Sequence, residues 1–170
     1  MLSLSDNEFA VIDFLVRNFY EKLTIRSIAI RLKFSPAGVF NILKKLEKEG
    51  IVRGEKLGTG LFYSMNFENR IAEHLAAVVL LHSDDKILLN LPSVENFESV
   101  ILHKKTLLVI GNVSSLDISV EGYEITAKAK EQFTEGLRKR EQVCAEFLSK
   151  GTVISGEQNI VAIIKGLLSR

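Results

Sequence analysis

One short segment, from Ser35 to Val52, carries both the start signal and the stop signal of a single helix. Its sequence is SPAGVFNILKKLEKEGIV, with Ser35 in a capping position, Pro36 in the first turn, where a backbone N–H is not needed, and Gly50 at the end. Apolar residues recur between these signals at spacings of three and four, namely Val39, Ile42, Leu43 and Leu46. The pattern predicts a helix with one buried face and a polar face rich in lysine.

Two further helices are expected before this segment and two strands after it. Asp6 is the expected N-cap of a helix over about residues 6–19, and Thr24 is the expected N-cap of a short helix that ends near Leu32. The strand-like segments IVRGEK and GLFYSMNF are joined at LGTG, whose glycines can adopt turn conformations. Three helices followed by a hairpin form the element order of a winged helix, which is expected over residues 1–67.

Charge is unevenly distributed along the chain. The net charge is only +1, but residues 24–60 contain 8 basic and 3 acidic residues. A local basic excess of this kind favours a partner with a phosphate backbone. The single cysteine, Cys144, excludes an internal disulfide and a cysteine-based metal site. The first residues show no signal-peptide pattern, and no apolar run approaches the ~20 residues that cross a bilayer, so we expect a cytoplasmic location and no membrane partner.

The first 67 residues resemble the winged helix-turn-helix transcriptional regulators of the MarR and ArsR type. The resemblance covers about residues 5–67 and rests on TIRSIAIRLK as positioning helix, FSPAGVFNILKKLEKEGIV as recognition helix and RGEKLGTGLFYSM as wing. It implies that the third helix enters the major groove of duplex DNA by its N-terminal half, while the wing reaches an adjacent phosphate or minor groove.

The resemblance also implies roles for ten residues. The residues expected to face base edges or nearby phosphates are Ser35, Ala37, Gly38 and Asn41. The residues expected to run along the DNA backbone are Lys44, Lys45 and Lys48, and those expected on or near the wing are Arg53, Lys56 and Thr59. Asn41 is the residue able to pair bidentately with adenine. Two alternatives stay open: the lysines form an ordinary solvated helix face, or the domain is a protein-interaction module that needs no basic surface.

The segment IAEHLAAVVLLH, residues 71–82, predicts an apolar helix within a linker over residues 68–85. Either it packs between two domains or it pairs with its copy in a homodimer, which would suit a palindromic DNA site. A metal site is conceivable here, because His74 and His82 are followed by Asp84 and Asp85. The favoured interpretation is that the residues at the helix end form a cap and a solvated turn, so no metal is assigned.

The remaining residues, 86–170, predict a small α+β domain. Short apolar runs rich in branched residues indicate strands at KILLNL (86–91) and KTLLVIGNV (105–113), and LDISVEGYEI (116–125) alternates as a third strand. A helical tract is expected from about Ala127 to Lys150 with a break near Lys139. TVIS is expected to form a further strand, and residues 157–168 a last helix.

The end of this half, EQFTEGLRKREQVCAEFLSKGTVISGEQNIVAIIKG, resembles the end of minimal nucleotidyltransferase domains, particularly those of archaea. The catalytic residues of that family are missing from the corresponding positions. Pro92 and Ser93 stand at the Gly-Ser pair, and Lys104, Lys105 and Thr106 stand where the family has its two aspartates. Asp117 or Glu121 could supply a third carboxylate, but one carboxylate is a poor Mg²⁺ site.

The sequence therefore predicts an α+β protein with a DNA-binding winged helix and a catalytically inactive nucleotidyltransferase-like domain. We expect a transcriptional regulator that binds double-stranded DNA as a homodimer and that is not an enzyme and has no cofactor. Its C-terminal half is expected to serve dimerisation or the sensing of a small molecule or nucleotide. Lys104 and Lys105 are either an anion-binding pair or solvated residues before a strand. A protein-interaction scaffold and an active nucleotidyltransferase are the alternative functions.

Overall fold

The computed structural model describes residues 3–81, 97–111 and 120–169, and these form a mixed α+β structure. The α+β class expected from the sequence is confirmed. Contacts divide the chain into two compact units, Met1–Val79 and Leu80–Arg170. No helix in the described ranges is both long and apolar enough to span a bilayer.

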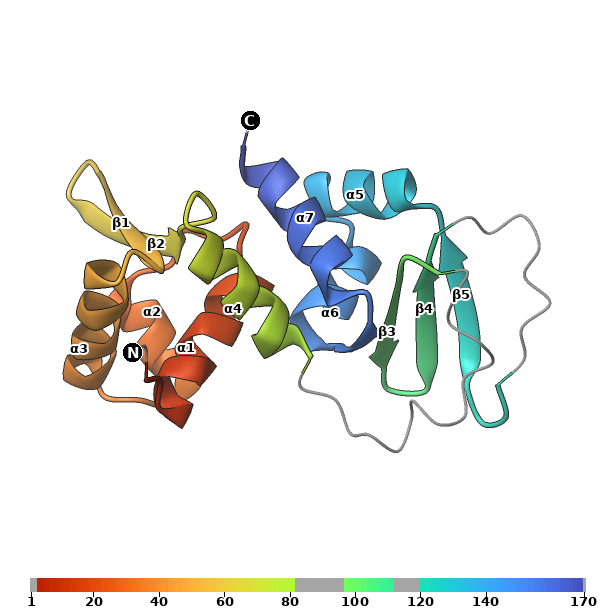
Figure 1. The fold of residues 1–170 in the computed structure, drawn as a ribbon, viewed down its shortest axis with the longest axis horizontal. Helices are drawn as coiled ribbons and strands as arrows, with labels where there is room; N and C mark the ends of the chain where they lie inside the picture. The colour runs from red at the N-terminus through yellow and green to blue at the C-terminus, as the bar shows by residue number, and fades with distance from the viewer. Residues whose placement is uncertain (1–2, 82–96, 112–119, 170) are drawn as a thin grey trace. The chain divides into compact units, whose positions relative to one another are not determined.

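The N-terminal unit begins with three helices, α1 (Asp6–Arg17), α2 (Ile25–Leu32) and α3 (Pro36–Lys48) (Figure 1). Thr24 caps α2 as expected, since its hydroxyl accepts a hydrogen bond from the Ser27 N–H. The expected cap of α1 is wrong: Ser5 is the N-cap, and Asp6 is the first helical residue. The Ser5 hydroxyl and the Glu8 carboxylate form a reciprocal capping box, which Asp6 could not form with the residue three positions after it.

The hairpin after α3 consists of β1 (Val52–Leu57) and β2 (Gly60–Met65), paired antiparallel with Leu57 opposite Gly60. Gly58, the first loop residue, has φ +61°, which matches a type II′ turn. A third segment joins this sheet, because Leu23, between α1 and α2, bridges Tyr63 and accepts its N–H at 2.8 Å. The hairpin is thereby attached to the start of α2 as well as to the end of α3.

The core of the N-terminal unit lies where the three helices meet the hairpin. Fully buried side chains come from α1 (Ile12, Leu15), α2 (Ile28), α3 (Leu43, Leu46) and β2 (Met65). Helix α4 (Arg70–Leu80) follows the hairpin and buries its alanines, while Ile71 and Val78 stay exposed.

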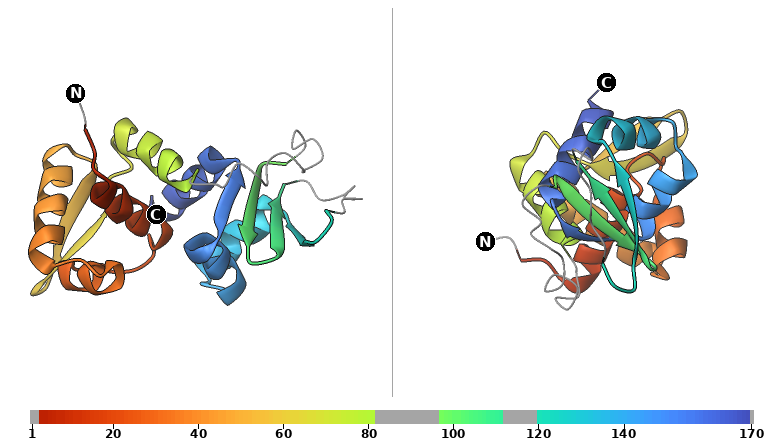
Figure 2. Two further views of the ribbon diagram at one scale, coloured as in Figure 1. Left: turned by 90° about the horizontal axis from the view of Figure 1, so that it is seen from below. Right: turned by 90° about the vertical axis from the view of Figure 1, so that its right-hand side faces the viewer.

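The C-terminal unit contains a four-stranded sheet in the order β5–β4–β3–β6. Its strands are β3 (Ser99–His103), β4 (Thr106–Ile110), β5 (Glu124–Lys128) and β6 (Thr152–Ser155). Strands β4 and β5 pair parallel, and the other neighbours pair antiparallel. Helices α5 (Lys130–Arg138), α6 (Gln142–Lys150) and α7 (Glu157–Leu168) cover one face of the sheet (Figures 1 and 2).

Several expected elements of this half are confirmed, and two are corrected. The helical break near Lys139, the TVIS strand and the last helix are present. The expected helix start at Ala127 is wrong, because Ala127 and Lys128 extend β5 by pairing with Val109 and Ile110 of β4. Strand β3 was not expected: it forms a hairpin with β4 whose loop contains neither glycine nor proline. The expected strand at residues 86–91 lies outside the described residues, as do the first four residues of the one at 116–125.

Candidate nucleic-acid interface

Helix α3 is built as its sequence predicts. The Ser35 hydroxyl accepts a hydrogen bond from the Gly38 N–H at 3.0 Å, and Pro36 occupies the first turn. A Cβ on Gly38 would lie 3.0 Å from the Ser35 hydroxyl, so the glycine leaves room for the cap. Gly50, with φ +70°, ends the turn that leads into β1. Ser35 and Gly38 therefore shape the start of the helix.

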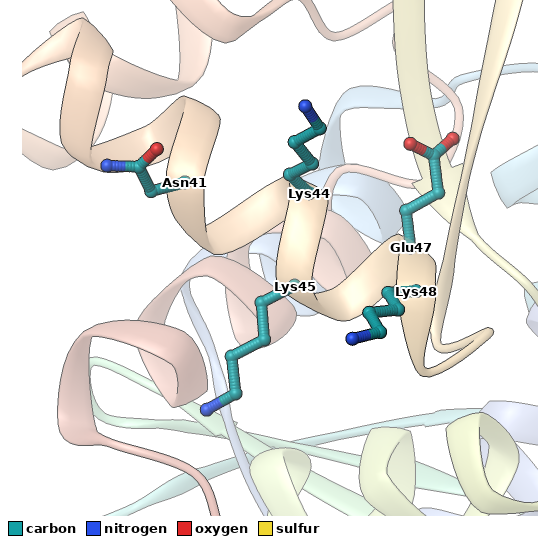
Figure 3. A pocket seen from close by; sticks show the side chains of 5 residues that line it. All are labelled: Asn41, Lys44, Lys45, Glu47 and Lys48. Atoms are coloured by element: carbon teal, nitrogen blue, oxygen red, sulfur yellow. The ribbon is translucent and has the colours of Figure 1, made fainter.

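The side of α3 opposite its buried residues presents a row at helical spacing. It consists of Ala37, Asn41, Lys44 and Lys48, all exposed. A shallow hollow of about 600 Å³ lies along the same helix, lined by Asn41, Lys44, Lys45, Glu47 and Lys48 (Figure 3). Within the described residues, neither Lys44 nor Lys48 forms an ion pair with a carboxylate. The row is thus a basic surface whose charges are free to meet an external anion.

Lys45 behaves differently from the two lysines beside it. Its ammonium lies 2.8 Å from Glu8 Oε1 and donates to Glu8 Oε2 and to the Ser3 carbonyl. Figure 3 shows Lys44 and Lys45 leaving the helix in opposite directions. Burial raises the pKa of Glu8, but the hydrogen bond and charge of Lys45, together with hydrogen bonds from Ser5, hold it below its ordinary value. The Lys45 ammonium is therefore held against α1 by its ion pair with Glu8.

An exposed aromatic ring lies beside the basic row. Phe40 is 42% exposed although it is apolar and sits in the middle of a helix. The Lys44 ammonium lies over this ring, 5.3 Å from its centroid. A cation–π contact of this kind at an exposed site contributes about 0.5–1 kcal/mol and helps to orient both side chains. Phe40 was not among the residues singled out from the sequence, because a phenylalanine in an amphipathic helix is usually assigned to the core.

Glu47 ties α3 to the hairpin. Its carboxylate accepts a hydrogen bond from the Gly54 N–H at 3.0 Å, and a Cβ on Gly54 would lie only 2.9 Å from that carboxylate oxygen. Burial raises the pKa of Tyr63, and the nearby Glu47 charge raises it further. Glu47, the one acid in the middle of the lysine-rich part of α3, is thereby turned toward the Gly54 N–H of the hairpin.

The three hairpin residues expected near the ligand occupy different places. Side chains alternate along β1, so Lys56 shares the face of buried Val52, whereas Arg53 lies on the opposite face. Thr59 is the second residue of the exposed loop. Lys56 and Thr59 are thus near the tip of the hairpin, and Arg53 is at its base on the other side.

Basic residues that sequence reasoning passed over lie elsewhere in the same unit. Lys22, Arg26 and Lys33 are exposed and make no ion pair with the described carboxylates. Lys22 lies 6.0 Å from the ring centroid of Phe62 on β2. Arg31, by contrast, is held by Glu21 at 2.5 Å and by the Asn18 side chain. The basic excess of residues 24–60 is the signal that could have identified Arg26 and Lys33.

In the C-terminal unit, Lys104 and Lys105 form the two-residue loop of the β3–β4 hairpin, and both are exposed. Lys104 has φ +58°. Glu121 is exposed, whereas Pro92, Ser93 and Asp117 lie outside the described residues. The loop position explains why two lysines interrupt an apolar stretch.

The residues considered for metal binding are only partly described. His74 is exposed on α4, and His82, Asp84 and Asp85 lie outside the described ranges. Among the side chains that are described, no three histidines, cysteines, aspartates or glutamates are grouped so as to hold a metal ion. The thiol of Cys144 is buried, and burial raises its pKa above the ordinary value.

Comparison with known proteins gives no match for this chain among protein families, curated proteins or solved structures.

Proposed function

We propose that this chain binds duplex DNA in a sequence-specific manner and regulates transcription. Helix α3 enters the major groove, and the β1–β2 hairpin acts as the wing of a winged helix. The observation that carries the proposal is the row of Ala37, Asn41, Lys44 and Lys48 on α3, in which a small residue and an amide precede two lysines that pair with none of the described carboxylates. Phosphate contacts supply affinity and register, while base contacts supply specificity.

The fold of the N-terminal unit supports this proposal. Leu23, β2 and β1 form a small sheet beside α3, and the Glu47–Gly54 hydrogen bond couples helix and hairpin. A helix and a hairpin held together in this way can contact one duplex as a single surface.

The test is a fluorescence-anisotropy titration of the full chain with a random-sequence duplex at several salt concentrations. Each phosphate contact contributes a slope of about −0.9 to the dependence of log binding constant on log salt for duplex DNA. We expect Lys44→Gln and Lys48→Gln each to reduce the slope by about that amount per bound chain. Lys45→Gln is the matched control, since it removes the same charge from the same helix and should leave the slope nearly unchanged.

Absence of salt-dependent binding by the wild-type chain would refute the DNA-binding proposal and favour a protein-interaction scaffold. An equal loss of slope in Lys44→Gln and Lys45→Gln would show that the chain binds through general charge and that this face of α3 is not the contact surface.

We further propose that the chain acts as a homodimer through α4. Ile71 and Val78 are 54% and 53% exposed and seven residues apart, so both lie on one side of the helix. Two copies would present two α3 helices to the two halves of a palindromic site. Analytical ultracentrifugation should show a dimer that Ile71→Glu/Val78→Glu converts to a monomer; an unchanged mass would refute this role of α4.

A further inference from the structure

The first two turns of α3 present no basic side chain. The exposed residues from the N-cap to the third turn are Ser35, Pro36, Ala37, Phe40 and Asn41, and the first lysine is Lys44. Guanine is read in the major groove chiefly by arginine or lysine, which donate to its O6 and N7 acceptors. The part of the helix expected to lie deepest in the groove therefore lacks the usual partner of a G·C pair.

The amide of Asn41 is available for an external partner. It is exposed, Figure 3 shows it pointing away from the helix, and it makes no hydrogen bond with the residues that the structure describes. An asparagine amide matches adenine, since its oxygen accepts from N6 and its NH₂ donates to N7. Against guanine the amide oxygen would face the O6 acceptor, and one of the two hydrogen bonds would be lost.

Apolar surface lies next to Asn41, because Phe40 is its neighbour and exposed Ala37 lies one turn earlier on α3. Phe40 is 42% exposed, and the Lys44 ammonium lies on its ring. In the major groove, thymine is distinguished by its 5-methyl group, which apolar side chains contact. An exposed phenylalanine beside an exposed asparagine thus offers contacts to both members of an A·T pair or to adjacent A·T pairs.

From these observations we infer that α3 reads an A·T core in each half-site, with Asn41 on adenine and Phe40 against a thymine methyl. The inference rests on the proposed DNA-binding function and specifies its ligand. Lys44 and Lys48, one and two turns further along, contact the flanking phosphates and do not choose the base.

The first step of the test is to select duplexes from a random pool with the 170-residue chain. The second step scans the selected duplex by replacing each adenine with 7-deazaadenine, which lacks N7, and each thymine with deoxyuridine, which lacks the methyl group. We expect at least one adenine whose replacement weakens wild-type binding about tenfold, the loss of one good base contact. We expect one thymine whose replacement weakens it about fourfold, the equivalent of one buried methyl group.

Variants then assign the contacts. Asn41→Ala should bind the normal and the 7-deazaadenine duplexes equally, and Phe40→Ala should no longer distinguish thymine from deoxyuridine. Lys48→Gln is the control: it should weaken binding to every duplex and keep both discriminations. Both Phe40 and Asn41 are exposed, so neither substitution removes core packing.

A selected core of G·C pairs, or analogue effects that persist in Asn41→Ala and Phe40→Ala, would overturn the inference and leave the DNA-binding function intact. Absence of salt-dependent binding by the wild-type chain would overturn both. The two failures are therefore distinguishable in the same set of titrations.

Discussion

The contact between Glu8 of α1 and Lys45 of α3 gives a sharp prediction about stability. The Glu8 side chain is only 7% exposed, and it accepts from the Lys45 ammonium and from the Ser5 N–H. Removal of the Lys45 ammonium leaves the Glu8 carboxylate largely shielded from water and with one hydrogen bond fewer. We expect Lys45→Gln and Glu8→Gln each to destabilise the N-terminal unit, and the double variant to be more stable than the sum of the two effects implies.

The size of this coupling follows from the burial of the two partners. A hydrogen bond to a charged group contributes about 1.5–3 kcal/mol, whereas an exposed ion pair contributes about 0–1 kcal/mol. Glu8 is nearly buried, but the Lys45 side chain is 45% exposed, so solvent screens part of the interaction. An intermediate coupling free energy of about 1–2 kcal/mol is expected at neutral pH.

The pKa of Glu8 sets the pH dependence. Because the folded protein holds this pKa below its ordinary value of 4.5, the unfolded chain takes up the proton first as the pH falls. The coupling is therefore complete above about pH 4.5 and is lost as the pH falls through the lower pKa of the folded state.

Tyrosine fluorescence can follow this unit alone. The chain has no tryptophan and three tyrosines, of which Tyr20 and Tyr63 belong to the N-terminal unit. In a Tyr123→Phe background, urea unfolding of the wild-type sequence and the three variants gives the coupling from a double-mutant cycle. A coupling below about 0.3 kcal/mol at pH 7, or one that does not fall on acidification, would refute this account.

Three further predictions concern single side chains. Leu43→Ala removes a fully buried side chain and should lower the unfolding free energy by about 2–5 kcal/mol in the same urea assay, whereas exposed Lys48→Ala should change it by less than about 0.5 kcal/mol. Gly156→Ala should lower the unfolding free energy by well over about 1–2 kcal/mol, because Gly156 has φ +74° and a Cβ there would lie 1.9 Å from a carbonyl oxygen. Gly166→Ala should raise the unfolding free energy by about 0.5–1 kcal/mol, because a Cβ there would meet no atom within 4 Å. Urea unfolding followed by circular dichroism measures both changes, and a reversed order would refute the packing described. Cys144 should react with a thiol reagent far more slowly in the folded chain than in urea, because burial excludes the reagent and raises the thiol pKa, and equal rates would contradict its burial.

Local signals in the sequence were sufficient for most elements of the N-terminal unit. The Thr24 cap, the Ser35–Pro36 start of α3 and the glycine-containing hairpin loop act within a few residues, so their effect can be read without tertiary contacts. The error at Asp6 arose because two adjacent residues could both cap α1, and the reciprocal bond with Glu8 selects Ser5.

Strands of the C-terminal unit were harder to predict. Strand β3 and the end of β5 depend on pairing with β4, which neither segment reveals by itself. The candidate interface shows the same limit, since three similar lysines of α3 were indistinguishable in the sequence until Glu8 was placed beside one of them.

What the sequence determined by itself was the order of helices and hairpin, the amphipathic face of α3 and the local excess of basic residues. Only the tertiary structure decided that Lys45 pairs with Glu8 of α1 while Lys44 and Lys48 pair with none of the described carboxylates, and that Glu47 faces the hairpin. The physical reason is the separation in sequence over which each effect acts. Capping and periodicity act over three or four residues, whereas the Lys45–Glu8 pair joins residues 37 positions apart.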